Sequence, residues 1–396
     1  MRWWPPVLLA FSLLLGGCTS MKGWWPLAQQ AEDAKSGEEA VVSNPVASGI
    51  SVRWRVDVDQ RRPKAPAGFS LPCVADDQGR QIIIIGGMDG RLRFLDADGS
   101  ELGWLALEGG VETGALQLDQ GPVVVGDMEG WLYGIDVHQQ RVIWRQQLSS
   151  LVQGKPVPTS QGFLVQTVDN RIYHFDSQGK KLWSFSGVPG GLAMRAGSSP
   201  VVAGDRVFAV MNSGDAVALR LQTGDLLWKR QLVLDTNAAV LSEIRVPLAD
   251  PLLISAPGSF QDEFLLVVPI YQGRLLFLSP ADGSEIRARN LSLKYRPLVK
   301  DRTLYVCDTR GAVYALDPAT AQSIWKRTIT DGELVGPVPS GDFLWVADEH
   351  GHVFRLDAFG ELKGKVDLPG RIDRAPVPFA DGVLVRTSRG VLYFLR

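Results

Sequence analysis

The sequence predicts an all-β protein, an eight-bladed β-propeller of four-stranded antiparallel blades. Three observations support this fold. A short strand motif recurs eight times at intervals near 40 residues, and in most copies a tryptophan follows the turn residue by 13 or 14 residues. The last copy also lacks a strand that the start of the folded region supplies. Repeats of this length with several strands each are typical of propeller blades.

Composition and charge narrow the class of protein further. The chain of 396 residues is 45% hydrophobic, which is ample for a buried core and excludes global disorder. A formal net charge of -2 gives no broad basic field, so nucleic acid is not expected as a partner. No apolar run reaches the roughly 18 residues that a membrane-spanning helix needs.

The N-terminus carries an export signal. Met1-Arg2 supplies a positive start, Val7–Leu15 is an apolar stretch, and Leu15-Gly16-Gly17 precedes Cys18. A short apolar core followed by small residues is typical of a secretory signal peptide, here residues 1–17. The segment resembles a bacterial lipobox, which implies palmitate-type acylation of Cys18 and, with Thr19 next, sorting to the outer membrane. The alternative is an ordinary signal peptide with an incidental cysteine.

Residues 18–50 are expected to form a tether behind the lipidated cysteine. The segment is mostly polar, and a flexible chain of this length has an end-to-end distance of roughly 30 Å. Trp24-Trp25 is the exception. The pair fits either the lipid interface or a contact with a partner, and the sequence does not choose between them.

The repeated motif is a turn residue followed by a strand of alternating apolar residues, as in Gly130-Trp-Leu-Tyr-Gly-Ile-Asp. The intervals between successive copies are 40, 40, 44, 59, 38, 40 and 39 residues. Each alternating run is typical of a half-buried strand. The copies begin at Gly90, Gly130, Asn170, Gly214, Gly273, Gly311, Gly351 and Gly390.

Three further strands accompany each motif. A second turn and an outer strand with a tryptophan follow it; the tryptophan is expected to pack on the next blade. An apolar strand precedes the motif, such as Val123–Gly126, and before that lies a strand that usually opens with proline, which suits a strand start. Arg287 and Lys365 stand where tryptophan is expected. The tryptophans are Trp54, Trp104, Trp144, Trp183, Trp228 and Trp325, and the prolines are Pro72, Pro156, Pro200, Pro251, Pro297, Pro337 and Pro376.

The two ends of the folded region complement each other. The last copy, Gly390 to Arg396, has no tryptophan strand, whereas Ser51–Val58 is a tryptophan strand with no blade before it. Joining them completes an eighth blade and leaves no free edge between blades. We therefore expect residues 51–396 to form one propeller.

A search for chemistry predicts no catalytic, cofactor or metal site. Cys73 and Cys307 fall in blades that do not touch, so they are expected to be buried thiols. His350 and His352 lack a cysteine or third histidine nearby and are interpreted as part of a surface turn. Five aspartates recur once per blade and are expected to cap the following turn. They are Asp96, Asp136, Asp176, Asp317 and Asp357.

Connections between blades differ in length, and the long ones are candidate binding loops. From the tryptophan to the next proline, most span 10 to 12 residues, but Trp183 to Pro200 spans 17 and Trp228 to Pro251 spans 23. Trp54 to Pro72 spans 18 across the closing junction. Long loops on a rigid frame are where binding concentrates. The apolar residues of these loops fit either a partner surface or packing under the loops themselves.

The lipobox, the tether and blades with the pattern Gly311-Ala-Val-Tyr-Ala-Leu-Asp-Pro-Ala-Thr320 resemble the BamB family, lipoprotein subunits of the bacterial outer-membrane β-barrel assembly machinery. The pattern is shared with all propellers of the PQQ-like repeat class. More specific is Leu192-Ala-Met194-Arg195, similar to a Leu-x-Leu-Arg segment before the family's fourth blade. Ser242–Arg245 with Asp250 resembles the acidic segment before its fifth blade, with fewer acids.

The resemblance implies a function and partners. It implies a non-enzymatic scaffold without a cofactor, held on the periplasmic side of the outer membrane by its lipid. The scaffold would dock on the periplasmic POTRA domains of BamA, join the rest of the complex and meet nascent outer-membrane proteins. The contact residues implied are Leu192, Met194, Arg195, Glu243, Arg245 and Asp250.

Two other functions remain open from the sequence. A quinoprotein dehydrogenase that uses pyrroloquinoline quinone has the same fold, and fold alone does not decide function. The chain lacks the adjacent cysteine pair that many such enzymes carry. A lipid-anchored propeller that serves another envelope partner is the third reading.

Overall fold

The computed structural model describes residues 49–59, 70–119, 121–152, 154–188, 198–232, 248–255 and 264–396. The chain divides into two compact units, Met1–Glu38 and Glu39–Arg396, and the described residues belong to the second. The described residues form strands and turns only, and none of them lies in a helix that could span a membrane.

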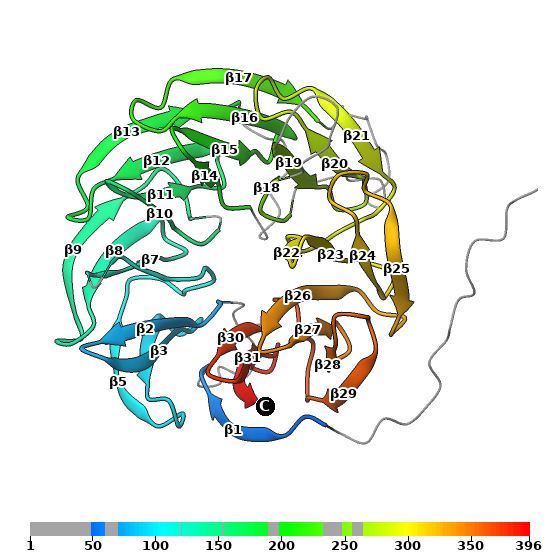
Figure 1. The fold of residues 1–396 in the computed structure, drawn as a ribbon. Helices are drawn as coiled ribbons and strands as arrows, with labels where there is room; N and C mark the ends of the chain where they lie inside the picture. The colour runs from blue at the N-terminus through cyan, green and yellow to red at the C-terminus, as the bar shows by residue number, and fades with distance from the viewer. Residues whose placement is uncertain are drawn as a thin grey trace, which may run out of the picture. The chain divides into compact units, whose positions relative to one another are not determined.

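The strands form eight antiparallel four-stranded sheets arranged as the blades of one ring (Figure 1). The inner strands are β2 (Cys73–Asp77), β6 (Leu116–Gln117), β10 (Val157–Thr159), β14 (Val201–Ala203), β18 (Leu252–Ser255), β22 (Leu298–Lys300), β26 (Leu334–Ser340) and β30 (Val377–Phe379). The second strands are β3 (Arg80–Gly86), β7 (Val123–Gly126), β11 (Gly162–Gln166), β15 (Arg206–Val210), β19 (Phe264–Pro269), β23 (Thr303–Cys307), β27 (Phe343–Asp348) and β31 (Gly382–Arg386).

The third strands carry the repeated motif. They are β4 (Arg91–Leu95), β8 (Trp131–Asp136), β12 (Arg171–Phe175), β16 (Asp215–Arg220), β20 (Leu275–Leu278), β24 (Ala312–Leu316), β28 (His352–Leu356) and β32 (Val391–Leu395). The outer strands are β5 (Glu101–Ala106), β9 (Arg141–Gln147), β13 (Lys181–Ser186), β17 (Leu226–Gln231), β21 (Glu285–Arg289), β25 (Ser323–Thr328), β29 (Leu362–Asp367) and β1 (Val52–Asp57). We number the blades 1 to 8 from β2 onward, so that β1 belongs to blade 8.

The predicted closure of the ring is confirmed. β1 pairs antiparallel with β32, with Arg55 opposite Tyr393 and Val56 opposite Leu392, and the sheet order is β1-β32-β31-β30. Figure 1 shows the two ends of the propeller side by side in this blade. The eighth blade is therefore built from both ends of the folded region.

The prolines open the inner strands as predicted, with one exception. Pro156, for example, directly precedes Val157 at the start of β10. Pro337 instead lies inside β26, where the pairing with β27 shifts register between Val335 and Val338. A bulge tolerates proline because the missing N–H is not needed in the ladder.

The hydrophobic core lies between the blades. The described buried apolar residues form eight clusters, and each cluster joins two neighbouring blades. The cluster between blades 5 and 6, for example, contains Val267 and Phe277 from one blade and Val306 and Leu316 from the other. Each blade thus buries its two faces against its neighbours, which is how stacked repeats form a continuous core.

Five of the six predicted tryptophans pack on the next blade. Trp228 lies against Gly283 in the turn between β20 and β21, and its indole N–H donates to the carbonyl of Pro280 at 3.1 Å. Gly283 has a φ of 74°, and a Cβ there would meet the indole at 2.7 Å. Trp54, Trp144, Trp183 and Trp325 have the same relation to a turn glycine.

Three outer strands depart from the tryptophan pattern. Arg287 faces blade 6, whose corresponding turn has Ala321 at φ 59° in place of glycine. In blade 7 the structure places Gly364 in the tryptophan position, opposite Arg355, and a Cβ there would meet Ile50 at 2.8 Å. Lys365 lies on the other face of the strand, over the ring of Phe354, so the prediction that it takes the place of the tryptophan is wrong.

In blade 1 the equivalent position is Gly103, opposite Phe94, and it is Gly103 that lies against Gln140 in the turn of blade 2. Trp104 lies on the other face of the strand, with the Arg91 guanidinium 4.2 Å from its ring, and is 47% exposed, so the prediction that it packs on the next blade is wrong.

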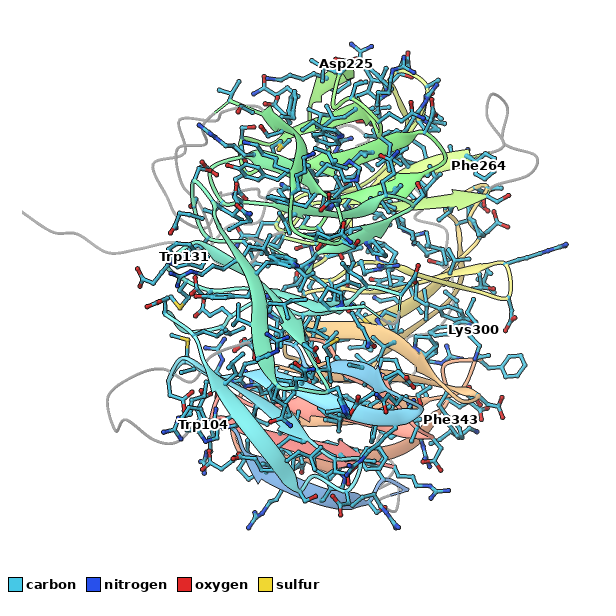
Figure 2. All side chains as sticks on the ribbon, turned by 90° about the vertical axis from the view of Figure 1, so that its left-hand side faces the viewer. Trp104, Trp131, Asp225, Phe264, Lys300 and Phe343 are labelled. Carbon is cyan, nitrogen blue, oxygen red and sulfur yellow. The ribbon has the colours of Figure 1, made fainter. Side chains whose placement is uncertain are left out.

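The ring has two faces that we name by what they carry. The connection face carries the links from one blade to the next and the turns between second and third strands; backbone bonds join these, such as Met128 N–H to Gly110 O at 2.9 Å. The hairpin face carries the turns between first and second strands. Figure 2 shows the ring from the side, with Trp131 near the first face and Phe264, Lys300 and Phe343 near the second.

Candidate functional site

A central cavity of about 290 Å³ opens among the residues that precede the inner strands. Every blade contributes to its wall, so the cavity lies on the ring axis at the connection face. Its apolar lining includes Leu71, Leu248 and Val335. Its charged lining is mixed in sign and consists of Glu112, Lys155, Asp250, Lys294, Arg296, Asp373 and Arg374.

A chain of polar contacts joins blades 5 to 8 beside the cavity. Tyr271 donates its hydroxyl to Glu333 at 2.8 Å, and Lys294 bridges Glu333 at 3.0 Å and Asp373 at 3.7 Å. Arg371 pairs with Asp373 at 2.9 Å. Burial and the neighbouring Glu333 carboxylate raise the pKa of Tyr271 to about 12, so its hydroxyl stays a donor. This side of the rim is held across four blades by one hydrogen bond and several ion pairs.

Asp250, which the resemblance assigns to partner contact, lies in the cavity wall. Its carboxylate accepts the backbone N–H of Ser199 at 2.6 Å and so links the start of blade 5 to the start of blade 4. Burial raises the pKa of Asp250, while the Ser199 bond and nearby Arg296 and Lys155 act in the opposite direction. The carboxylate therefore has a structural task at the cavity.

The other predicted contact residues lie outside the described residues. They are Leu192, Met194, Arg195, Glu243 and Arg245, and the same is true of Cys18. The described residues that flank the two long connections are Val188 and Ser198, and Leu232 and Leu248. These flanks follow an outer strand or precede an inner one, so both connections leave and rejoin the ring at the connection face.

The two cysteines are free and buried, as predicted. Cys73 is 6% and Cys307 1% exposed. Burial raises the pKa of both thiols, most strongly that of Cys307, because a thiolate is poorly solvated in an apolar site. They are core residues of two different blade junctions.

The recurring aspartates cap their turns, as predicted. Asp176 accepts the N–H groups of Gln178 at 3.0 Å and Lys180 at 2.8 Å, and Asp357 serves the equivalent turn of blade 7. Their function is structural.

A second set of turn aspartates was not predicted. Asp127, Asp308 and Asp348 lie three residues before the motif glycine and accept two backbone N–H groups of the turn between second and third strands. The signal was present in the sequence, because aspartate recurs at this position in three copies of the repeat. Asp348 also lies next to the histidine pair.

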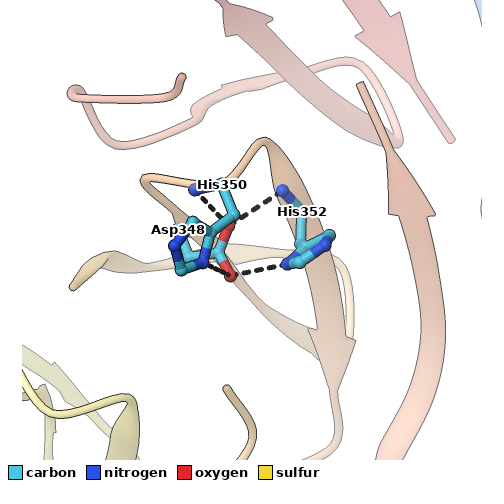
Figure 3. Close-up of side chains that lie close together, drawn as sticks. All are labelled: Asp348, His350 and His352. Atoms are coloured by element: carbon cyan, nitrogen blue, oxygen red, sulfur yellow. Dashed lines mark hydrogen bonds and ion pairs between the residues drawn. The ribbon is translucent and has the colours of Figure 1, made fainter. Parts of the chain in front are cut away.

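His350 and His352 lie beside Asp348 at the turn between β27 and β28 (Figure 3). The Nδ1 atom of His352 is 2.7 Å, and that of His350 is 4.0 Å, from Asp348 Oδ2. The sequence correctly predicts a turn but not the carboxylate between the two imidazoles. Among the described residues these three form the group with the composition of a metal site.

Comparisons with known proteins agree on one family. The family model described as outer membrane protein assembly factor BamB matches residues 88–327 and 266–361. A protein of that name from Alkalilimnicola ehrlichii is 32% identical over 209 residues, which are 52% of each chain. One from Nitrosomonas eutropha is 24% identical over 98% of this chain and 93% of its own. The alignments with the Alkalilimnicola ehrlichii and Legionella pneumophila relatives cover about half of those proteins.

Solved structures share the fold. The crystal structure of BamB from Moraxella catarrhalis has a TM-score of 0.72 at 18% identity and covers 88% of this chain and 99% of its own. A quinohemoprotein alcohol dehydrogenase from Comamonas testosteroni has a TM-score of 0.68 at 12% identity, with 87% and 76% covered. At these identities the likeness concerns the fold alone. The family model matches more than half of the chain and decides the family: the chain belongs to the family of outer membrane protein assembly factor BamB.

Proposed function

We propose that this protein is a non-enzymatic scaffold in the assembly of outer-membrane proteins. The observation that carries the proposal is the family match across residues 88–361. The protein is anchored through a lipid on Cys18, faces the periplasm and holds its partners at the connection face. Its cavity wall contains ion pairs and turn caps in which the described carboxylates already serve the fold, which supports a binding task over catalysis.

The partner surface comprises the two long connections before blades 4 and 5, and the partner is the POTRA region of BamA. Leu192, Met194 and Arg195 come from the first connection, and Glu243 and Arg245 from the second. The sequences of both connections contain apolar and charged residues, which is the composition of a protein interface. The rigid contacts at their flanks, such as Asp250 with Ser199, support loops held on a firm base.

Crosslinking tests this surface. A photoreactive amino acid at position 195 is expected to crosslink to BamA in intact envelopes. The double variant Leu192→Ala/Arg195→Ala is expected to lose co-purification of BamA, because a few central residues carry most of an interface's binding energy. Retention of normal co-purification by this variant would place the contact elsewhere.

The outer strand of blade 3 offers a matched control. Lys181 and Leu182 are a basic residue and a leucine on β13, the strand that precedes the first long connection, and both are exposed. Lys181→Ala/Leu182→Ala is expected to leave BamA binding unchanged. Equal loss in both double variants would indicate a general defect of blade 3 and not a contact.

The lipid anchor has its own test. Cys18→Ser is expected to move the protein from the outer-membrane fraction to the soluble periplasm and to abolish incorporation of labelled palmitate. The acyl chains that hold the protein on the membrane are attached to this cysteine, so loss of the cysteine removes the anchor entirely. Unchanged fractionation with no palmitate in the unaltered protein would contradict the anchor without touching the docking proposal.

A further inference from the structure

We propose that the turn between β27 and β28 binds a divalent transition-metal ion through Asp348, His350 and His352 (Figure 3). The two histidine nitrogens and the aspartate oxygen lie within 4.8 Å of one another. Imidazole nitrogens with one carboxylate are ligands that suit zinc, copper and nickel. Zinc is the ion we use as the probe.

The distances match a site that needs only small side-chain rotations. Asp348 Oδ2 lies 2.7 Å from His352 Nδ1 and 4.0 Å from His350 Nδ1. Around tetrahedral zinc with bonds of about 2.0–2.1 Å, neighbouring ligand atoms are roughly 3.3 Å apart. The two observed distances bracket this value, so the ion replaces the direct contact between His352 and the carboxylate.

Asp348 is held in place before any ion arrives. Its Oδ1 accepts the backbone N–H groups of His350 at 3.0 Å and His352 at 2.9 Å. Its Oδ2 accepts the hydroxyl of Thr330 at 2.7 Å, and the side chain is fully buried. Hydrogen bonds that orient a ligand in this way strengthen metal binding.

The equivalent turns of blades 2 and 6 show what is particular to blade 7. There Asp127 and Asp308 receive the hydroxyl groups of Tyr133 at 2.8 Å and Tyr314 at 3.0 Å. In blade 7 the corresponding aromatic residue is Phe354, which has no hydroxyl. The positions of His350 and His352 are occupied by Glu129 and Trp131 in blade 2, and by Arg310 and Ala312 in blade 6. The same scaffold thus presents nitrogen ligands where its counterparts present a phenol.

Two more carboxylates complete the surroundings. Asp331 Oδ1 lies 3.8 Å from His350 Nδ1 and is 96% exposed, so it is free to turn in as a fourth ligand. Asp367 Oδ1 lies 3.7 Å from the outer nitrogen of His352 and is placed to orient that ring as an outer partner. The rings of His350 and His352 are 49% and 28% exposed, which gives an ion access from solvent.

Zinc titration of the full-length protein, purified in detergent without a polyhistidine tag, tests the site. Calorimetry is expected to show one zinc ion per chain, and cobalt is expected to give the visible absorption of a tetrahedral site. His350→Ala is expected to weaken binding by about tenfold or more, because it removes a ligand. The described structure gives this ring no hydrogen bond to the fold, so thermal unfolding without metal should be unchanged.

His138 provides a matched control. Its ring is 62% exposed and lies 3.2 Å from Asp77, a histidine–aspartate pair without a second imidazole. His138→Ala is expected to keep zinc binding intact, whereas Asp367→Asn is expected to weaken it by about tenfold. Absence of zinc binding, or equal binding by the unaltered protein and His350→Ala, would overturn the proposal and leave His352 as a hydrogen-bond partner of Asp348.

Discussion

Two blade junctions differ at one position of the repeat. Arg386 and Cys307 both lie four residues before the motif glycine, and each is paired with the second residue after it, Leu392 and Val313. Arg386 points into the junction between blades 8 and 1, and Cys307 lies in the junction between blades 6 and 7. One junction buries a charge where the other buries an apolar thiol.

The charged junction ties together segments that are far apart in the chain. Arg386 donates to the Asp59 carboxylate, to the Ser70 hydroxyl and to the carbonyls of Ser70 at 3.3 Å and Gly86 at 2.9 Å. Arg386 is 7% and Asp59 8% exposed. Burial lowers the pKa of Arg386, and the Asp59 carboxylate opposes this by stabilising the charge.

The apolar junction needs no such bonds. Cys307 is surrounded by Leu334, Val346 and Phe354 in one continuous cluster. Blades 6 and 7 are complete hairpin-built sheets joined by a short connection, whereas in blade 8 the outer strand β1 is held to β32 by pairing alone, with no hairpin between them. The comparison indicates that packing alone suffices inside the ring, and that directional bonds fix the register where the ends meet.

The junction between blades 3 and 4 lies between these extremes. Gln166, at the same repeat position, donates to the carbonyl of Val210 at 2.9 Å, and Ser198 donates to it at 3.0 Å. In the charged junction, Arg386 and Ser70 likewise both donate hydrogen bonds to one carbonyl, that of Gly86. The arginine therefore extends a neutral arrangement by adding an ion pair.

The largest expected effect comes from Arg386→Ala. It removes the guanidinium that pairs with the buried Asp59 carboxylate, so the free energy of unfolding should fall by about 3–5 kcal/mol. Cys307→Ala at the matching position should cost only about 1 kcal/mol. Urea denaturation of both variants measures the difference, and equal losses would contradict the contrast between the junctions.

A smaller effect is expected when both charges are removed together. Arg386→Met with Asp59→Asn should recover about 2 kcal/mol relative to Arg386→Ala, because no buried charge is left unpaired. The asparagine oxygen keeps an acceptor for the Met88 N–H, which Asp59 now binds at 2.7 Å. If the double variant is as unstable as Arg386→Ala, the arginine acts through its carbonyl contacts and not through the ion pair.

The smallest effect concerns reactivity and not stability. Burial raises the pKa of the Cys307 thiol, so at pH 8 the folded protein holds less thiolate than an unfolded chain and should react more slowly with iodoacetamide. Cys18→Ser confines the readout to Cys73 and Cys307. Mass spectrometry of each peptide, with a sample in urea as the reference, measures the rate. Reaction of Cys307 at the unfolded rate would mean that this junction opens readily.

The fold was predictable because the strand pattern of one blade occurs eight times in the sequence. Eight motif copies define the blades, and the unmatched ends near Trp54 and Gly390 define the closure. Arg287 is explained only by the turn of the next blade, which has Ala321 in place of glycine. The register that puts Gly364 and not Lys365 in the tryptophan position, and Gly103 in place of Trp104, cannot be read from the spacing alone. Pro337 does not open its strand because it lies in a bulge of β26, and a bulge has no simple sequence signal.

Single contacts were less predictable than the fold. Arg386 meets Asp59 across 327 residues of chain, and no periodic pattern announces such a pair. The place of Asp348 beside His350 and His352 has no distinct sequence signal, because an aspartate two residues before a histidine is also what a capped turn contains. Asp250 was selected by family resemblance, and its bond to Ser199 could not be read from either segment alone.

The closing blade also has a mechanical consequence. β1 runs antiparallel to β32, and backbone bonds between Ser51 and Arg396 at 2.8 and 3.0 Å extend the pairing to the last residue. A pull along β1 from residue 51 loads these bonds together in shear and does not open them one at a time. Two residues after the end of β1, the ion pair between Asp59 and Arg386 resists sliding of the strand. The propeller is thus built to bear tension at the point where its chain enters the ring.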